Sequence, residues 1–482
     1  MPRSARRAKI ICTLGPATGT AERVDALIVA GMDVARLNFS HGTHEEHAAR
    51  IALVRQAARR RDRVVGILQD LSGPKIRVGD LERGRVRLVP GAQVRLTNQE
   101  VLGTAERIGT TYPDLPRVVA RGDEILLDDG LLKLAVEEVE DDEVVCRVVE
   151  GGLLKPHKGM NLPGAEVSGP SLTPKDEDDV RFGLTQAVDY IAMSFVRRPA
   201  DVEGLRAVLD AAGSRVPIIA KLETPQAISR LDAILAVSDG VMIARGDLGV
   251  EVPPERVPII QKQVLARAVE SRGVAIVATQ MLNSMTENPR PTRAETSDVS
   301  NAVFDGADAM MLASETASGK HPIEAVRMMD RIIRAAEEHH LQGGGVRQRL
   351  QRTDLTFPDA ICDAARHVAR ETNARLIACF TQTGETASLL SKYRPGVPIV
   401  AFTPLPDACG RMAILWGVEP RVMKIPDNID RLIARLERRL LADGLAVSGD
   451  TVVVVCGAPL YLAGRTNLLK LHTMGDAEAH LT

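Results

Sequence analysis

The sequence is poor in aromatic residues, almost neutral in charge, and free of long apolar runs. Aromatic residues make up 2% of the 482 positions, which leaves few rings on which the bases of single-stranded nucleic acid could stack. The net charge of −2 provides no strong positive field for a polyanion. No run of about 18 apolar residues occurs, so no membrane-spanning helix is expected. We therefore expect neither a nucleic-acid nor a membrane partner.

Cysteine is also scarce and scattered. The six cysteines lie far apart and form no C-x-x-C pair, so the sequence predicts neither a zinc knuckle nor a disulfide framework. Isolated cysteines in apolar surroundings are typical of reduced, cytoplasmic proteins. The N-terminal segment MPRSARRAKIICTLGPAT is basic, but it lacks the apolar core of a signal peptide. We expect a cytoplasmic protein.

Eight short apolar runs alternate with helix-like segments, and each run ends in polar residues. The runs begin at Lys9, Asp33, Val64, Val188, Val216, Asp239, Gly273 and Gly306. Such alternation predicts a parallel sheet that is covered on both faces. Polar residues at the carboxyl end of every strand favour a (β/α)₈ TIM barrel. The alternative is an open doubly wound sheet, whose polar ends would gather at one switch point.

One interval between runs is much longer than the others. The third and fourth runs start about 124 residues apart, against about 23–34 elsewhere, which exceeds an ordinary loop. Short alternating runs in this interval predict antiparallel strands, and hence an inserted small β-barrel domain that covers the site as a lid. A Gly- and Gln-rich linker at 340–351 then precedes renewed strand–helix alternation. The expected domains are a barrel (1–77 and 165–338), the lid (78–164) and a C-terminal α/β domain (339–482).

The polar ends of the runs contain the candidate functional residues. These are Arg36, Asn38, Ser40, His41, Asp70, Arg77, Lys221, Glu223, Arg245, Asp247, Thr279, Gln280, Ser314 and Glu315. Lys221 and Glu223 are two positions apart, so both point into the barrel mouth. Glu223 and Asp247 come from adjacent strands, and two carboxylates with open water positions suit Mg²⁺. The alternative is that these charges form buried salt bridges that plug the barrel.

The neighbouring cations indicate an anionic substrate. Lysine and arginine beside a Mg²⁺ site suit a phosphorylated or carboxylated molecule. Gly246 would let the backbone amides before Asp247 approach an anion closely. His44 and His47 lack an H-E-x-x-H pattern, so we interpret them as an exposed helix start rather than metal ligands. No P-loop and no G-x-G-x-x-G is present.

With these motifs in view, the sequence resembles the pyruvate kinases over nearly its whole length. The motifs are ARLNFSHGTHEEH, GPKIRVG, GMNLPG, IIAKLETPQAI, MIARGDLGVE, ATQMLNSM and PRPTRAETSDVSNAV. The resemblance implies a phosphotransferase (EC 2.7.1.40) that transfers a phosphoryl group from phosphoenolpyruvate to ADP and gives pyruvate and ATP, the last step of glycolysis. It also implies a barrel, a lid, a C-terminal regulatory domain and a homotetramer. Such chemistry depends on positioning and charge neutralisation.

The resemblance also implies roles for individual residues. Glu223 and Asp247 would bind Mg²⁺ or Mn²⁺, and Lys221 would contact the transferred phosphoryl group and stabilise the enolate. Arg36 would bind the phosphate. Gly246, Asp247 and Thr279 would hold the substrate carboxylate, and Thr279 would help a water to protonate the enolate. The nucleotide side would be served by Asn38, His41, Arg77 and Lys158.

A monovalent-cation site is implied at Asn38, Ser40, Asp70 and the carbonyl of Leu71. The K⁺-dependent members that resemble this sequence carry Glu where Lys75 stands. Because like charges repel at short range, we hypothesise that Lys75 replaces K⁺ and that the enzyme does not require it. The alternative is that Lys75 points to solvent.

Two further segments depart from the family pattern or extend it. Ala313 stands where the family usually has Ser, and either Ser314 or Thr279 alone could take over its role. In the third domain, Thr381, Thr383, Gly384 and Thr386 resemble an effector-phosphate loop, since hydroxyls and free amides at a helix N-terminus bind anions. The alternative is a plain helix cap. The segment CGAPLYLAGRTN differs from members that respond to fructose-1,6-bisphosphate, so we expect a sugar monophosphate or AMP.

Two other functions stay open at this point. A barrel lyase or aldolase that handles pyruvate enolate on Mg²⁺ would share Lys221, Glu223 and Asp247, but it would need neither the lid nor Lys158 and Arg77. A catalytically weak metabolite sensor would keep only the effector loop. Formation of ATP from phosphoenolpyruvate distinguishes all three.

Overall fold

The computed structural model describes residues 6–165, 169–340, 355–426, 428–460 and 465–476. The predicted linker lies, except for its first residue, outside these ranges. Within the described residues, no helix has both the length and the apolar character needed to cross a membrane.

Eight parallel strands close into a barrel, as the sequence predicts. They are β1 (Lys9–Thr13), β2 (Val34–Asn38), β3 (Gly66–Asp70), β12 (Tyr190–Met193), β13 (Ile218–Leu222), β14 (Gly240–Ala244), β15 (Val274–Ala278) and β16 (Ala309–Leu312). Each strand pairs with its neighbour in the chain, and β1 pairs with β16 to close the ring. The prediction of a TIM barrel is confirmed, and the carboxyl ends of all eight strands meet at one rim.

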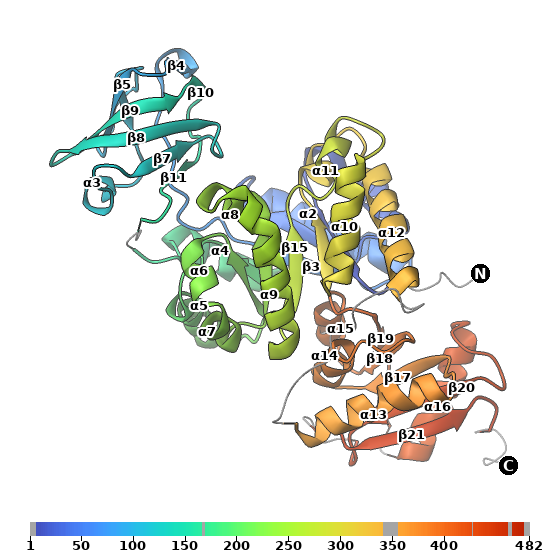
Figure 1. Ribbon diagram of the computed structural model, residues 1–482. Coiled ribbons are helices and arrows are strands. Elements are labelled where there is room, and N and C mark those ends of the chain that lie inside the picture. Colours follow the sequence, from blue (N-terminus) through green and yellow to red (C-terminus); the bar gives the residue numbers. More distant parts are fainter. Residues whose placement is uncertain (1–5, 166–168, 341–354, 427, 461–464, 477–482) are drawn as a thin grey trace.

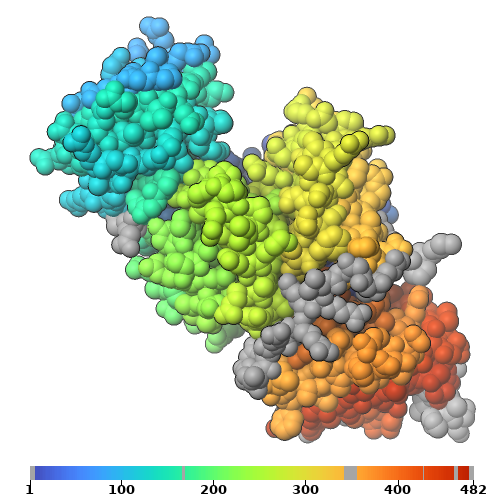
Figure 2. All heavy atoms as spheres, viewed as in Figure 1, coloured from blue at the N-terminus to red at the C-terminus, as the bar shows by residue number. Residues whose placement is uncertain are grey.

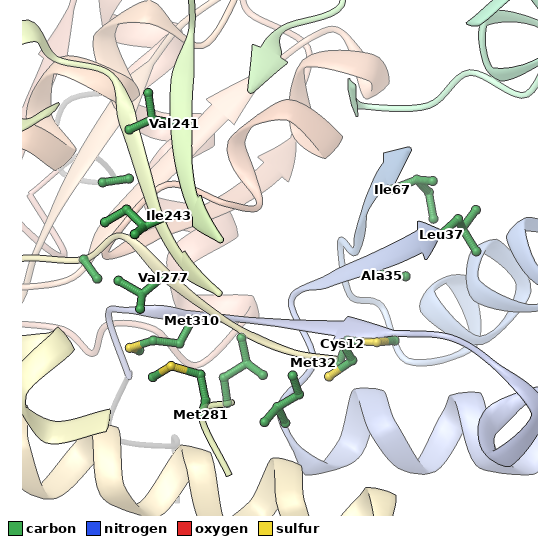
Figure 3. Close-up of a cluster of buried hydrophobic side chains, with 14 of the residues drawn as sticks. Cys12, Met32, Ala35, Leu37, Ile67, Val241, Ile243, Val277, Met281 and Met310 are labelled. Carbon is green, nitrogen blue, oxygen red and sulfur yellow. The ribbon is translucent and has the colours of Figure 1, made fainter. Parts of the chain in front are cut away.

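Helices follow the strands and cover the outside of the barrel (Figure 1). Those packed around the barrel are α1 (Ala21–Ala30), α2 (His44–Arg60), α4 (Pro174–Thr185), α5 (Pro199–Ala211), α7 (Leu231–Val237), α9 (Val257–Ser271), α10 (Arg293–Phe304) and α12 (Pro322–His339). Short helices at the strand ends are α6 (Pro225–Ser229), α8 (Arg245–Glu251) and α11 (Ser314–Ala317). Alternate strand residues such as Cys12, Leu37, Ile243 and Met310 form one buried cluster with the helices (Figure 3).

An aspartate precedes every second strand of the barrel and binds the backbone of the strand before it. Asp33, Asp189, Asp239 and Asp308 stand directly before β2, β12, β14 and β16. Their carboxylates accept backbone N–H groups of β1, β3, β13 and β15 at 2.7–2.9 Å. These bonds satisfy donors at the amino-terminal rim and help to fix the strand register.

Asp189 makes the stability of this rim depend on pH. Burial raises the pKa of Asp189 to about 6, against about 3.9 for an unfolded chain. The folded protein binds this proton more tightly, so the free energy of unfolding falls as pH rises from about 4 to about 6. We expect Asp189→Asn to remove that decline in urea unfolding. Asp239→Asn is the control, because Asp239 makes the same kind of bond with its side chain 46% exposed. Equal pH slopes in wild type and Asp189→Asn would contradict this assignment.

The segment between β3 and β12 forms a separate β-rich lobe. Its strands are β4 (Val86–Leu88), β5 (Gln93–Thr97), β6 (Arg107–Gly109), β7 (Glu124–Leu127), β8 (Leu132–Val139), β9 (Glu143–Glu150), β10 (Gly152–Leu154) and β11 (Met160–Asn161), with a short helix α3 (Leu115–Val118). In the part of the lobe that the structure describes, these strands form a six-stranded and a two-stranded sheet rather than one closed barrel. Register shifts within the β8–β9 pair interrupt that ladder and bend the strands. All pairs are antiparallel except β5–β6.

The lobe projects from the barrel, and the space beside it is open on the face shown in Figure 2. A direct contact between the two is the hydrogen bond from Asn161 Nδ2 to Glu251 Oε1 of α8, at 2.8 Å. The lobe therefore lies next to the carboxyl-terminal rim, as a lid would.

A five-stranded sheet forms the C-terminal unit. Its order is β19 (Val418–Val422), β18 (Ile399–Thr403), β17 (Leu376–Phe380), β20 (Thr451–Cys456) and β21 (Leu468–Thr473), and only β21 runs antiparallel. Its helices are α13 (Phe357–Glu371), α14 (Glu385–Lys392), α15 (Pro406–Met412) and α16 (Ile429–Ala442).

This unit packs against the amino-terminal rim of the barrel. The buried Lys392 Nζ lies 2.5 Å from Asp308 Oδ2. Gly410 approaches Asp189 so closely that a Cβ there would lie 1.8 Å from Oδ1. The carboxyl-terminal rim, on the opposite side of the barrel, stays free for a ligand.

Candidate active site

The carboxyl-terminal rim brings together a buried charge cluster from three strands. Arg36 Nε lies 2.6 Å from Asp70 Oδ2, and Lys221 Nζ lies 3.2 Å from Asp70 Oδ1. Lys221 Nζ also lies 2.9 Å from Glu223 Oε1. Asp70 and Glu223 are 1% and 2% exposed. The sequence predicted that these side chains lie together, and the structure places them so.

Opposite charges keep this cluster ionised. Burial acts to raise the pKa of Asp70, but Arg36 and Lys221 outweigh it and hold that pKa below its usual range. Burial likewise acts to lower the pKa of Lys221, while Asp70 and Glu223 raise it well above its usual value. Lys221 is therefore a permanent cation at neutral pH. The two cations, Arg36 and Lys221, balance the two carboxylates, Asp70 and Glu223, and the guanidinium and ammonium groups supply the N–H donors for an anionic ligand.

The residues implied for a monovalent cation fit such an ion in part. Asp70 Oδ1 is buried and accepts no hydrogen bond of good geometry from the described residues, which suits a cation ligand. Asn38 ends β2, and its side-chain oxygen accepts the N–H of Ser40 at 3.2 Å. Leu71 is buried directly after β3.

Glu223 and Asp247 suit a divalent cation. Burial raises the pKa of Glu223, Lys221 opposes this, and the nearby Asp247 raises it further. Such repulsion between carboxylates is relieved by a divalent cation. Within the described residues no cluster offers three or more His, Cys, Asp or Glu ligands. Two carboxylates with the remaining positions left to water and substrate are the ligand set that Mg²⁺ prefers.

Thr279 directly follows β15, and Gly246 lies just after β14, so both stand at the carboxyl-terminal rim. Thr279 Oγ1 accepts the N–H of Gly246 at 2.7 Å and donates to the carbonyl of Ala278 at 2.6 Å. Thr279 has a φ of 68°, a left-handed conformation that is unusual for a β-branched residue. Such strain persists where surrounding structure holds it and is typical of functional sites.

Lys75 lies on the lid side of this rim and not at Asp70. Its ammonium is 3.5 Å from Asp247 Oδ1 and 4.0 Å from Asp129 Oδ1 of the lobe. The ion pairs of Asp70 are instead with Arg36 and Lys221. The expected placement of the Lys75 ammonium at the cation position is therefore not seen in this conformation, because other cations already neutralise Asp70.

The residues implied for the nucleotide side lie at the lobe and at the end of β2. Arg77 donates to the carbonyl of His157 at 2.9 Å, and Lys158 Nζ lies 2.7 Å from Asp128 Oδ1. His41 is exposed, and its carbonyl lies 3.0 Å from His47 Nε2. The contacts of Arg77 and Lys158 cited here therefore lie within the lobe.

The interpretation of the two histidines as an exposed helix start is wrong in part. Helix α2 does begin at His44, but His47 is 1% exposed. Its ring stacks on Phe39, with centroids 4.0 Å apart. Phe39 follows β2, and its aromatic face makes burial of His47 favourable.

Two further residues of the rim, which are not among the candidates predicted from the sequence, stand at the ends of the first and fourth strands. Thr13 ends β1 and accepts a hydrogen bond from Arg36 Nη1 at 3.0 Å. Ser194 follows β12, and its Oγ accepts a hydrogen bond from Lys221 Nζ at 2.7 Å. The same strand-end rule would have found both.

The segment around Ala313 is organised by Glu315. The carboxylate of Glu315 accepts the N–H groups of Leu282 and Ala313 at 3.0 and 2.8 Å. Ser314 is exposed and reaches Asn283 at 3.5 Å. In this structure its hydroxyl therefore points to the rim surface and not to the cluster around Lys221.

Three of the effector-loop residues, Thr381, Thr383 and Thr386, line a cavity of about 330 Å³ in the C-terminal unit. Thr381 follows β17 and accepts the N–H of Gly384 at 2.9 Å, and Thr386 Oγ1 lies 2.7 Å from Thr466 Oγ1. Arg272 from the end of α9 and Arg465 also line the cavity. Thr383 is exposed at its edge. Hydroxyls, a helix N-terminus and two guanidinium groups suit a phosphate.

Comparison with known proteins agrees with this geometry. Residues 5–326 match the family model "Pyruvate kinase, barrel domain", and residues 359–472 match "Pyruvate kinase, alpha/beta domain". The chain is 46% identical to the pyruvate kinases of Mycobacterium intracellulare and Mycobacterium tuberculosis, over 98% of this chain and 99% of each relative. A solved pyruvate kinase from Cryptosporidium parvum is 38% identical, with a TM-score of 0.90 over 97% of this chain and 96% of that one. The chain belongs to the pyruvate kinase family and is a phosphotransferase of that class (EC 2.7.1.40).

Proposed function

We propose that this protein transfers the phosphoryl group of phosphoenolpyruvate to ADP and releases pyruvate and ATP. The observation that carries the proposal is the buried Lys221 ammonium, held between Asp70 and Glu223 at 3.2 and 2.9 Å. A fixed cation in a water-poor site stabilises charge that develops during phosphoryl transfer.

Each side chain of the rim has its own role in the proposed reaction. Arg36, fixed by Asp70 and Thr13, binds the substrate phosphate and orients it for in-line transfer. Lys221 neutralises the phosphoryl oxygens in flight and then the enolate oxygen. The amides at Gly246 and Asp247, with Thr279, hold the substrate carboxylate. Thr279 orients the water that delivers a proton to the enolate carbon.

Glu223 and Asp247 would hold Mg²⁺ or Mn²⁺. A divalent cation bound there would polarise the oxygens of the phosphoryl group and of the enolate. On the lid side, Asn38, His41, Arg77 and Lys158 would bind the nucleotide phosphates and ribose. Closure of the lobe over the rim would exclude water, which otherwise would accept the phosphoryl group.

We also propose that the reaction does not require K⁺. Supporting this, Arg36 and Lys221 already pair with Asp70, and Lys75 adds a third cation at Asp247 of the same rim. A further cation would meet repulsion from them. The monovalent-cation position at Asn38, Ser40, Asp70 and Leu71 would then be neutralised by the protein itself.

The rate of pyruvate formation tests both proposals at once. With phosphoenolpyruvate, ADP and Mg²⁺, we expect equal rates in K⁺-free buffer and in saturating KCl at matched ionic strength. In Lys75→Glu, saturating K⁺ should raise the rate by about tenfold or more. The substitution replaces a positive charge by a negative one, and this favours the binding of a cation. A strong K⁺ requirement in the wild type would contradict the role of Lys75 but not the reaction. No pyruvate and no ATP in either buffer would contradict the reaction itself.

The resemblance to the family also leads to proposals about regulation and assembly. We propose that a sugar monophosphate or AMP binds the cavity at Thr381, Thr383, Gly384 and Thr386, and that the protein is a cytoplasmic homotetramer. The functional units would be the barrel at 1–77 and 165–338, the lid at 78–164 and the regulatory domain at 339–482. The cationic side chains of Arg272 and Arg465 at the cavity support an anionic effector.

A further inference from the structure

We propose that Ser194 is a positioning residue that holds the Lys221 ammonium in place for phosphoryl transfer. The inference rests on the proposed reaction and adds to it a neutral partner for the lysine. Ser194 directly follows β12 and is 2% exposed. Its hydroxyl stands between two other strand ends of the rim, those of β3 and β13.

The hydrogen bonds of Ser194 have a defined direction. The Ser194 hydroxyl donates to the carbonyl oxygen of Leu71 at 2.7 Å. A serine hydroxyl has one hydrogen, so the oxygen presents lone pairs to its other neighbour. That neighbour is Lys221 Nζ, which donates to Ser194 Oγ at 2.7 Å. The serine therefore accepts from the ammonium and cannot compete with it for the substrate's oxygens.

Ser194 is the nearest of three oxygen neighbours of the Lys221 ammonium. Glu223 Oε1 and Asp70 Oδ1 lie at 2.9 and 3.2 Å. An ammonium has three N–H groups, and in the reaction one of them must turn to the phosphoryl group or the enolate. Both carboxylates are also proposed cation ligands, so their charge environment changes when the site is filled. The serine is uncharged and is itself not a proposed cation ligand.

The backbone around Ser194 is itself held firmly. The next residue, Phe195, has a φ of 54°, a conformation that a bulky residue adopts only when its surroundings impose it. Its N–H donates to Glu223 Oε2 at 2.7 Å, and its carbonyl accepts from Ser171 Oγ at 2.9 Å. A Cβ at Gly73 would lie 3.0 Å from Ser194 Cβ. The hydroxyl is therefore preorganised, as a residue that orients another must be.

Ser194→Ala tests the inference, with Ser391→Ala as a matched control. Both variants remove the hydroxyl of a buried serine that donates to a backbone carbonyl, but Ser391 donates to Trp416 in the C-terminal unit, whereas Ser194 contacts Lys221 at the rim. We expect Ser194→Ala to lower kcat for pyruvate formation about 30- to 100-fold, since a misplaced catalytic group costs rates of this order. The KM for phosphoenolpyruvate should stay within about threefold, because Arg36 still binds the phosphate. Ser391→Ala should leave kcat near that of the wild type.

Crystal structures of the two variants separate this inference from the proposed reaction. We expect the Lys221 ammonium to move away from residue 194 in Ser194→Ala and to stay in place in Ser391→Ala. An unmoved ammonium, or equal kcat values in the two variants, would overturn the role of Ser194. If the wild type forms no ATP but the ammonium moves in Ser194→Ala, the proposed reaction is contradicted, while the contact that positions Lys221 is supported.

Discussion

Replacement of Lys221 by methionine is expected to lower kcat for pyruvate formation by about 10³-fold. A preorganised donor to a developing oxyanion is worth about 10²–10³ in rate, and here the donor also carries a full charge in a buried site. Methionine keeps the length and apolar stem of lysine but supplies no N–H group and no charge. Steady-state kinetics with phosphoenolpyruvate, ADP and Mg²⁺ measure the loss. Most of it should fall on kcat, because the interaction grows in the transition state.

Lys392→Met is the matched control for this variant. Lys392 is also a buried lysine paired with an aspartate, Asp308, but it lies at the interface with the C-terminal unit. Its loss should lower stability and leave kcat per folded molecule nearly unchanged. A Lys221→Met enzyme with kcat within about tenfold of the wild type would contradict the central role of this ammonium.

Asp70→Asn is expected to reduce both stability and activity. The carboxylate of Asp70 faces the cations of Arg36 and Lys221 at 2.6 and 3.2 Å, and the three side chains are almost fully buried. The removal of one partner from a buried ion pair leaves uncompensated charge and costs about 3–5 kcal/mol. The freed arginine and lysine should also lose their fixed positions, so that kcat falls with the unfolding free energy.

Urea unfolding and kinetics on the same preparation measure the two effects. Asp25→Asn is the control, because Asp25 pairs with Arg61 at 2.5 Å on the protein surface, where salt bridges contribute little. An Asp70→Asn protein as stable as Asp25→Asn would mean that the cluster at the rim is not held by its charges. The account of Arg36 and Lys221 as prepositioned cations would then be wrong.

The barrel could be predicted from the sequence because its signals are local and repeated. Each strand is a short apolar run, and each run breaks into polar residues at the rim where a ligand binds. Lys221 of β13 and Glu223 directly after that strand could be placed together because residues two apart share one side of a strand. The approach of Asp70, Lys221 and Glu223 in space follows from the closed order of the strands.

Side-chain directions that depend on distant elements could not be predicted. His47 is buried because its ring stacks on that of Phe39, which lies eight residues earlier, directly after β2. Lys75 turns toward Asp129 of the lobe and Asp247 of α8, and nothing in the local sequence around GPKIRVG specifies that turn. The two-sheet form of the lobe depends on which strands pair with one another, and run lengths do not reveal that pairing.

Phosphorus NMR follows the phosphoryl group itself and is the most direct test of the proposed reaction. The full-length protein is incubated with phosphoenolpyruvate, ADP and Mg²⁺ in K⁺-free buffer. We predict that the phosphoenolpyruvate resonance disappears and the γ-phosphate resonance of ATP grows in equal amount, with only traces of inorganic phosphate. An unchanged phosphoenolpyruvate resonance, or inorganic phosphate in place of ATP, would contradict transfer to ADP at this rim.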